Sequence, residues 1–572
     1  MKKIPLYKAK PMSTSQHDDA STRQSTAISC QLEQNVQWVQ AYFERCSDLL
    51  IRRFLVGQTQ SCPAVLLHLD GMTDGGALHD MILHPLMRPI CIDDAILHSV
   101  SQRQEILSCI HTASDQKKAY QTAEENSFDY FAFVASQLLS AGEVTFAETM
   151  EDSVQAMMNG DAVLLLEGSR IGFIIDVKGF PHREMGEPRN EKVLRGPQEA
   201  FVEAMRVNTA MIRRRLHTNQ LKLEMLTLGK QTKTLVSLVY LDGVANANII
   251  DEVRRRLNNI QEVDSILNAS CVEQYIEDNP FSIFPQMQYT ERPDKVAAAL
   301  LEGRVALVVD GSPDVILLPV LFVQLLQSPE DYYNRILPGT FIRWIRYVGL
   351  FIATTLPSLY VAITSFHPEL LPINLLLSIT TAREGVPFPA FVEALMMELA
   401  FELLREASIR LPGAIGNTIG IVGALVIGDA AVSARLVAPQ MVIVVAITAI
   451  GSFAIPSVEA SDAIRLIRFP LMLLAAVFGL YGVVFGWMLV LIHMVQLRSF
   501  GFPYLQPLAP LKKRELYDVV IRAPRWRMML QPLFREATQR KNEDGVPSFW
   551  AAFFHRSVQP LAERGDDSRG QQ

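Results

Sequence analysis

Three glutamates in a largely apolar stretch are the residues best spaced to do chemistry. Glu398, Glu402 and Glu406 recur every four residues within 387–410, so on a helix they lie on one face. On a helix that lines a water-filled path, such carboxylates favour cations, and several copies around an axis would turn each acid into a ring. Alternatively, the segment is an amphipathic helix on the outer membrane surface, or a charge run that is not helical.

These glutamates lie inside an apolar third of the chain, residues 345–497. A helix that crosses a bilayer needs roughly 20 mainly apolar residues. Four runs reach or approach that length, namely 345–366, 413–427, 436–455 and 469–497. Residues 370–379 are apolar but too short to cross, and 456–468 are polar enough for an outer loop. We therefore predict an all-α polytopic membrane domain with four spans and one or two re-entrant or interfacial helices.

Small residues mark one of these runs as a packing surface. Its glycines are Gly413, Gly416, Gly420 and Gly423. Two of them form a G-x-x-x-G motif, which lets helix backbones approach closely. The pattern predicts tight helix packing, within one chain or between chains.

Composition and motifs exclude several classes of function. The net charge is -7 with acids and bases interspersed, which does not indicate nucleic-acid binding. The six cysteines form no C-x-x-C pair and fit a reducing cytosol. No P-loop, G-x-G-x-x-G or nucleophile-elbow motif occurs. We therefore predict no enzyme activity, no cofactor, and no catalytic or metal-binding residue.

Charge also predicts the orientation in the membrane. Residues 1–35 are polar and lack the apolar core of a signal peptide, so the large front domain is expected to stay cytoplasmic. Arg343 and Arg346 precede the first span, and the tail 498–572 is basic, which also places both ends inside. Two cytoplasmic ends require an even number of crossings.

The front domain contains one pattern twice. Apolar strands at 64–69 and 235–241 each end in Asp-Gly and lead into a helix. Later strands at 162–166 and 305–309 each follow a helix and end in an acidic residue, Gly and Ser. The continuous apolar runs indicate strands that are buried on both faces. We predict two similar α/β subdomains.

The expected domain order follows from these patterns. It is a disordered polar leader at 1–35, a first cytosolic α/β subdomain at 36–190, a helical connection with the second subdomain at 191–327, a coupling segment at 328–344, the membrane domain at 345–497 and a basic cytoplasmic tail at 498–572. The helical connection is expected to begin near Pro197. Its triple arginine, Arg213, Arg214 and Arg215, is either a solvated face or a contact for a neighbouring subunit or lipid. Ser328, before Pro329, is expected to cap a short helix.

Three long motifs resemble one protein family. They are VLRGPQEAFVEAMRVNTAMIRRRL at 193–216, GRVALVVDGSPDVILLPVLFVQLLQSPEDYY at 303–333 and REGVPFPAFVEALMMELAFELLREASIRLPGAIGNTIGIVGALVI at 383–427. All three are similar to the A subunits of GerA-type germinant receptors, the spore germination proteins of endospore-forming bacteria. The resemblance covers about residues 40–535.

The resemblance implies a function that composition does not. Such A subunits lie in the spore inner membrane and act with a transporter-like B subunit and a lipoprotein C subunit. They are thought to self-associate into a ring that forms a nutrient-gated cation channel. A related branch assists dipicolinic-acid release. That branch, a non-conducting scaffold or signalling subunit, and a secondary transporter stay open as alternatives.

Overall fold

The chain folds into two compact units, which we describe separately. The computed structural model describes residues 26–56, 62–87, 134, 144–178, 188, 190–411, 423, 425–512 and 516–522. Unit 1 comprises Met1–Glu44 and Asp48–Pro181, and unit 2 comprises Arg45–Ser47 and His182–Gln572. Most of the predicted leader and most of the basic tail lie outside the described residues.

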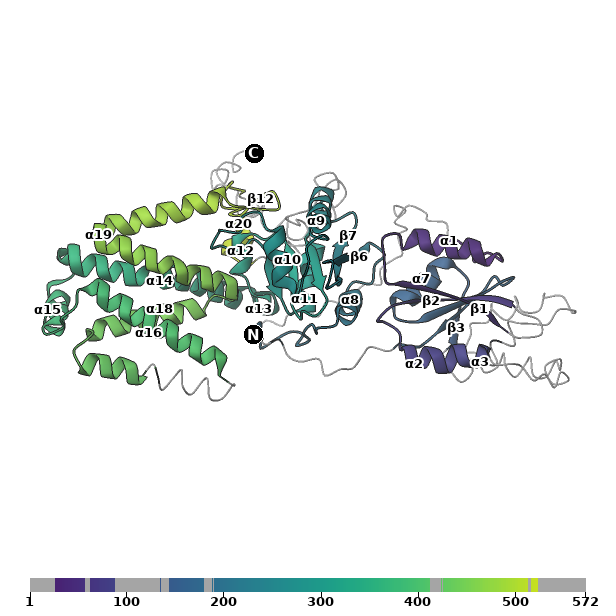
Figure 1. Ribbon diagram of the computed structural model, residues 1–572, viewed down its shortest axis with the longest axis horizontal. Helices are drawn as coiled ribbons and strands as arrows, with labels where there is room; N and C mark the ends of the chain where they lie inside the picture. Colours follow the sequence, from purple (N-terminus) through teal and green to yellow (C-terminus); the bar gives the residue numbers. More distant parts are fainter. Residues whose placement is uncertain are drawn as a thin grey trace, which may run out of the picture. The chain divides into compact units, whose positions relative to one another are not determined.

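Unit 1 is a five-stranded sheet between two helical layers. Its elements are α1 Leu32–Tyr42, β1 Leu49–Val56, β2 Cys62–Leu69, α2 Gly75–Ala77, the π-helix η1 Leu78–Leu83, α3 His84–Met87, β3 Val144–Ala147, α7 Met150–Met158, β4 Ala162–Leu166 and β5 Gly172–Ile175. The strand order is β1-β2-β4-β5-β3, and every pair is antiparallel. Helices α2 to α3 cover one face and helices α1 and α7 the other (Figure 1).

Unit 2 begins with a second α/β subdomain of the same topology. Its elements are α8 Met205–Arg213, β6 Leu221–Leu228, β7 Thr234–Leu241, α9 Ala247–Asn259, α10 Ala269–Ile276, β8 Gln288–Thr290, α11 Pro293–Leu301, β9 Val305–Val309 and β10 Val315–Leu318. The order β6-β7-β9-β10-β8 repeats that of unit 1, again with antiparallel pairs. Helices α9 and α10 pack on one face, and α8 and α11 on the other. The predicted pair of similar α/β subdomains is confirmed.

The acidic-Gly turns occupy matching places in the two subdomains. Gly71 and Gly243, just after β2 and β7, have φ of 78° and 74°. Gly168 and Gly311, just after β4 and β9, have φ of 83° and 79°. Glycine adopts this left-handed conformation without the steric cost that a Cβ would add. The repeated glycines therefore serve the turns that return the chain across each sheet.

The helix predicted to begin near Pro197 starts later, at Met205. Gly196 instead has a φ of 121°, and a Cβ there would lie 2.6 Å from the ring of Tyr333. The backbone is held against this aromatic ring, so Pro197 does not open a helix although its type suits a first turn.

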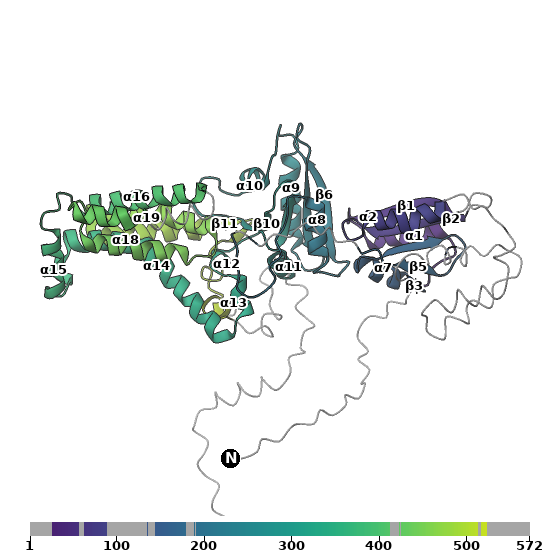
Figure 2. The ribbon, with the colours of Figure 1, turned by 90° about the horizontal axis from the view of Figure 1, so that it is seen from below.

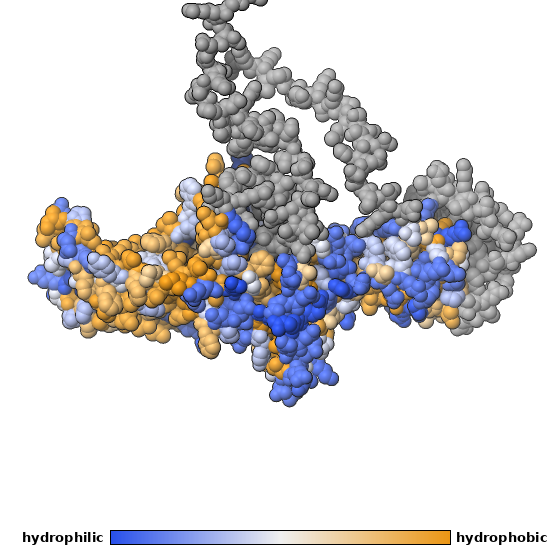
Figure 3. Space-filling model, turned by 90° about the horizontal axis from the view of Figure 1, so that it is seen from above, coloured by the Kyte–Doolittle hydropathy of each residue, from blue (hydrophilic) through white to orange (hydrophobic). Residues whose placement is uncertain are grey.

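The helical region follows two short helices, α12 Phe322–Leu325 and α13 Pro329–Tyr333. Its elements are α14 Ile336–Phe366, the 3-10 helix η4 Pro368–Leu370, α15 Ile373–Arg383, α16 Ala390–Arg410, α18 Pro439–Phe453 and α19 Val458–Gln496, then β11 Arg498–Ser499, β12 Phe502–Pro503 and α20 Leu516–Val520. Apolar residues gather over the surface of these helices (Figure 3). Among the described residues, α14 and α19 are long and apolar enough to cross a membrane.

Several boundaries differ from those predicted. Helix α14 begins at Ile336 rather than 345, because Pro338 and Gly339 lie in its first turn, where proline is tolerated. Helix α18 has 15 residues and is shorter than a usual span. Residues 413–422 and 424 of another predicted span, 413–427, lie outside the described residues. The outer loop expected at 456–468 is helical instead and forms the start of α19.

Helix α19 reverses direction at Gly479, which has a non-helical φ of 60° and ψ of -139°. Its two arms, 458–478 and 480–496, run back along each other in Figure 1. A Cβ at Gly486 would lie 2.4 Å from Leu471 Cδ2, so glycine allows the close approach. The 39-residue helix is therefore a hairpin of two arms.

We expect Gly479→Ala to destabilise this hairpin by about 1 to 3 kcal/mol, because glycine alone adopts this backbone conformation readily. The new Cβ would also lie 2.9 Å from His367 Cε1. Thermal unfolding in detergent measures the effect. Gly428→Ala is the control, since its Cβ would meet only Val442 Cγ1, at 3.5 Å. Equal melting temperatures for the two variants would contradict the assigned turn.

Candidate functional site

The predicted coupling segment carries a buried carboxylate. Ser328 caps α13 as expected, with its hydroxyl accepting from Glu330 N. Asp331, on the same short helix, is 1% exposed and accepts a 2.6 Å hydrogen bond from Arg346 Nη1. The fully buried Arg343 Nε lies 3.5 Å from the same Asp331 oxygen. Both arginines belong to the first turns of α14, and Figure 2 shows α13 beside the beginning of that helix. Charge pairing therefore joins α13 to the first candidate span.

Helix α20, the last helix that the structure describes, closes over the same turns of α14. Arg343 donates to the Asp518 carbonyl and lies 3.6 Å from its carboxylate. Tyr332 donates to Asp518 Oδ2 at 2.9 Å, and Arg522 Nη2 donates to the Tyr332 carbonyl at 3.0 Å. Trp344 Nε1 donates to Val520 O at 2.8 Å. The beginning and the end of the helical region thus meet at one place.

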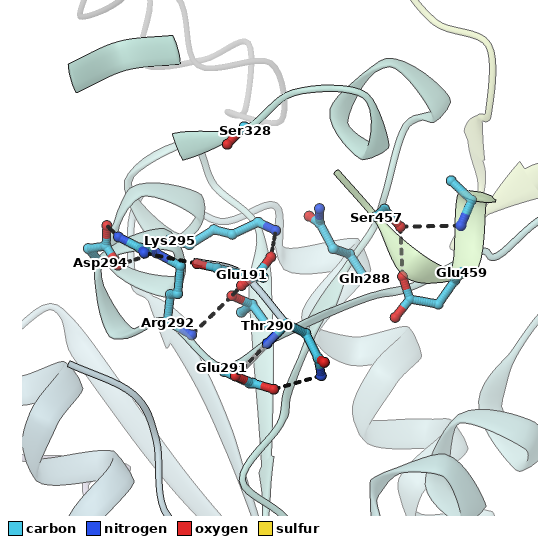
Figure 4. Close-up of polar contacts among 12 residues, drawn as sticks. Glu191, Gln288, Thr290, Glu291, Arg292, Asp294, Lys295, Ser328, Ser457 and Glu459 are labelled. Atoms are coloured by element: carbon cyan, nitrogen blue, oxygen red, sulfur yellow. Dashed lines mark hydrogen bonds and ion pairs between the residues drawn. The ribbon is translucent and has the colours of Figure 1, made fainter. Parts of the chain in front are cut away.

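A polar network connects the α/β subdomain to α13. Glu191 accepts from Thr290 Oγ1 and from Lys295 Nζ (Figure 4). The buried Arg292 pairs with Asp294, whose Oδ2 also accepts from the Tyr333 hydroxyl of α13. A small cavity of about 100 Å³ lies beside this network, lined by both subdomain and helical residues, including Gln288, Ser328 and Ser457. Hydrogen bonds and ion pairs therefore connect the α/β subdomain to α13.

Apolar packing joins the same parts. Val320 and Leu325 from the end of the α/β subdomain share one buried cluster with Ala353 of α14 and with Ile455 and Ile464 near the start of α19. The turn between α18 and α19 therefore lies at the α/β end of the helices, not on the outer side.

The three predicted glutamates lie on α16, and each pairs with an arginine. Glu398 is 2% exposed and accepts from Arg468 on the first arm of α19. Glu402 accepts a 2.8 Å bond from Arg465, one turn earlier on that arm. Glu406 pairs with Arg410 on its own helix, and both are exposed. Their pore-lining role stays a prediction, and in this chain the first two hold α16 against α19.

Sequence reasoning missed a fourth carboxylate on α16. Glu393 is fully buried, accepts a 3.0 Å bond from Arg383 Nη2 and accepts from Ala438 N at 3.0 Å. It lies outside the four-residue register of the other acids. The signal that could have revealed it is an acid in an apolar helix, which must find partners when it is buried.

The other predicted contacts have different surroundings. Gly423 lies against Leu404 of α16, since a Cβ there would approach Leu404 Cδ2 to 2.6 Å, whereas Gly413, Gly416 and Gly420 lie outside the described residues. Arg213 is 1% exposed and donates to the carbonyls of Thr218 and Leu221. It is therefore not available to a subunit or lipid, contrary to that interpretation of the triple arginine.

Arg214 and Arg215 both pair with Glu199 and are partly exposed. Their predicted contact with a neighbouring subunit or lipid stays a prediction. Within the described ranges, no cluster of three His, Cys, Asp or Glu side chains is arranged to hold a metal ion.

Acids gather where the sheet edge meets α19. Burial raises the pKa of Asp314, which precedes β10, to about 6, and the negative charges of Glu291, Glu459 and Glu191 add to the rise. Glu459 comes from the first turn of α19, and its side chain accepts from Ser457 (Figure 4). Proton uptake at Asp314 therefore relieves repulsion at the junction between subdomain and helices.

Comparisons with known proteins agree over most of the chain. The model of the Bacillus/Clostridium GerA spore germination protein family matches residues 37–534. The "Uncharacterized membrane protein YfkQ" of Bacillus subtilis (strain 168) is 40% identical over 509 residues, which cover 89% of this chain and 92% of that protein. "Spore germination protein KA" of the same organism is 37% identical over 540 residues, 94% of this chain and 91% of that protein.

A solved structure is also similar. It is the crystal structure of the N-terminal domain of the A subunit of the Bacillus megaterium spore germinant receptor GerK3. It is 30% identical in sequence, with a TM-score of 0.37, and the match covers 52% of this chain and 99% of that domain.

We expect Asp331→Asn to destabilise the protein by about 3 to 5 kcal/mol, because it leaves Arg343 and Arg346 buried beside a neutral amide. Thermal unfolding in detergent measures the loss. The matched control is Glu330→Gln on the same helix, whose carboxylate forms no ion pair within the described part of the chain. A loss no larger than that of the control would show that the arginines do not depend on Asp331.

We also expect Asp314→Asn to stabilise the protein at pH 7.5 but not at pH 4. The folded-state pKa of about 6 exceeds the ordinary value of 3.8, so the stabilising contribution of the protonated acid is complete below 3.8 and is lost as pH rises through 6. The amide imitates the protonated acid and is expected to add about 1 kcal/mol at pH 7.5, after allowance for solvent screening. Melting curves at both pH values, beside those of the exposed Asp264→Asn, check this. A gain that does not depend on pH would refute it.

Proposed function

Because the chain belongs to the Bacillus/Clostridium GerA spore germination protein family, we propose that it is the A subunit of a nutrient germinant receptor. It acts in the spore inner membrane, beside a transporter-like B subunit that binds the nutrient and a lipoprotein C subunit. Several copies associate in a ring, and the ring conducts cations when the nutrient is bound.

The observation that carries the channel proposal is the charge ladder between α16 and α19. Glu398 and Glu402 on α16 face Arg468 and Arg465 on the first arm of α19. Paired in this way, the carboxylates cannot attract cations, which suits a closed state. If the two helices separate and water enters, the same carboxylates become a cation-selective lining. Opening therefore requires an energy source, because the ion pairs and the packing between the two helices must be broken before water solvates the separated charges.

The coupling segment supplies the route for that energy. Asp331 fixes α13 to the first turns of α14, and Asp294 fixes α13 to the α/β subdomain. A shift of the subdomains within the ring therefore moves the base of α14. The Ala353 carbonyl of α14 accepts a 2.9 Å hydrogen bond from Arg468 Nε. A movement of α14 therefore acts on one arginine of the charge ladder.

The topology is consistent with this arrangement. The first turns of α14 and helix α20 lie together, as the bond from Trp344 to Val520 shows. Both ends of the helical region are therefore on one side, which requires an even number of crossings, although the two arms of α19 replace the single last span of the predicted four. That side is the cytoplasmic, or core, side.

We expect Glu398→Gln and Glu402→Gln to reduce cation flux severalfold, because each removes a carboxylate from the open path. The experiment counts subunits by mass in detergent, then reconstitutes the chain with its B and C subunits in liposomes and follows nutrient-triggered K⁺ efflux. Glu406→Gln is the control, since Glu406 is exposed and, among the described residues, its ion pair is with Arg410 of the same helix.

A charge swap distinguishes a role of Glu402 in conduction from a role in helix packing. Glu402→Arg combined with Arg465→Glu keeps the ion pair but moves the carboxylate to α19. If Glu402 only packs the helices, the swap restores flux; if it lines the path, flux or ion selectivity stays altered. Unchanged flux in all variants removes these residues from the pore. A monomer or dimer that stays silent with its partner subunits points to a scaffold or signalling role instead.

A further inference from the structure

An apolar groove of about 800 Å³ runs between α14 and the second arm of α19. Its lining includes Phe351 and Thr355 of α14, and Val484, Trp487 and Leu491 of α19. Trp487 Nε1 donates to Thr355 Oγ1 at 2.9 Å and the indole stacks on Phe351, so the one polar group of the indole is satisfied. Val484 and Leu491 are 69% and 50% exposed. The groove suits a flexible hydrocarbon chain.

A polar hollow of about 510 Å³ adjoins one end of this groove. Gln496, the last residue of α19, lines both spaces, so they adjoin at this residue. The hollow is otherwise lined by residues of α9 and the following loops and by the end of α19 and the turn after it, including Glu252, Arg256, Asp278, His493 and Arg498. Figure 1 shows this arm of α19 ending beside β12, next to the α/β subdomain. The two adjoining spaces thus change from apolar to polar where the helix leaves the apolar region.

The charges of the hollow leave one cation without a partner. Arg256 is neutralised by Glu252 at 2.7 Å and Asp278 at 2.5 Å, and Asp278 also accepts from Phe500 N at 2.7 Å. Arg498 is exposed, and within the described part of the chain its guanidinium forms no ion pair or hydrogen bond. A guanidinium is well suited to bind a phosphate through two donors.

We propose that the groove and the adjoining hollow together bind a glycerophospholipid, with one acyl chain in the groove and the phosphate at Arg498 and Gln496. Inside a bilayer, the acyl chain gains little by exchanging lipid for protein, since both are apolar. Selectivity therefore comes from the phosphate, which makes Arg498 the residue that separates a specific site from ordinary surrounding lipid. A helix of another protein chain suits the space less well, because its apolar surface would bury the charged hollow without satisfying it.

The test titrates the full-length chain in detergent with phosphatidylglycerol and follows bound lipid by native mass spectrometry. Arg498→Gln removes the charge, and Val484→Trp fills the groove at an exposed position. We expect each to weaken binding roughly tenfold or more, as the loss of a charge-assisted hydrogen bond predicts for the arginine. Arg435→Gln is the matched control, because Arg435 is exposed near Gly385, at the α15 end of the helices, away from this hollow.

Two further probes identify the occupant. Dioleoylglycerol lacks the phosphate, and we expect it to bind wild type and Arg498→Gln equally weakly. Glycerol 3-phosphate lacks the acyl chains, and we expect no competition from it. Equal lipid retention by Arg498→Gln and Arg435→Gln would overturn the site, as would competition by glycerol 3-phosphate, which would indicate a free-phosphate site. A changed subunit number in Val484→Trp with unchanged lipid binding would assign the groove to a helix of a second copy and also overturn the proposal.

Discussion

The buried carboxylate of Asp331 is the constraint on which the junction of unit 2 depends. An ionised group inside a protein is strongly unfavourable unless partners compensate the lost water. Arg346 and Arg343 are such partners, and they are themselves almost fully buried, so none of the three can leave without exposing the others. Helix α13 and the base of α14 are therefore held together. Asp518 also lies beside Arg343, so the same buried charges hold helix α20 in place.

Buried charges that require partners also determine how the helices of the helical region pack. Glu398 and Arg468 are both about 2% exposed, and Glu393 is fully buried beside Arg383. In an apolar environment such pairs fix which helix faces which, because a mismatched neighbour would leave a charge unpaired. In the proposed gating, the same pairs hold the helices together when dry, and their carboxylates attract cations when wet. The helix packing and the proposed gating thus both depend on the cost of leaving a charge unpaired in an apolar environment.

The two α/β subdomains share a strand order but not their surroundings. In unit 2, the residues after the last strand, from Val320 onward, enter a buried cluster with α14 and α19. Tyr333 adds a hydrogen bond from α13 back to Asp294. The second subdomain has the same strand order as the first. Its sheet edge is also bonded to the helices of unit 2, so it helps to hold those helices in place.

The sequence by itself determined what depends on near neighbours along the chain: the buried strands and their glycine turns, the Ser328 cap, and the placement of Glu398 and Glu402 on one helix face. It could not reveal which charge each carboxylate meets. Charges usually end an apolar span, so the sequence assigned Arg465 and Arg468 to a polar loop. Only the tertiary structure places them beside acids more than 60 positions away, and this pairing allows a helix to bury them. Pairing satisfies these charges through space, so spacing along the chain carries no signal for it.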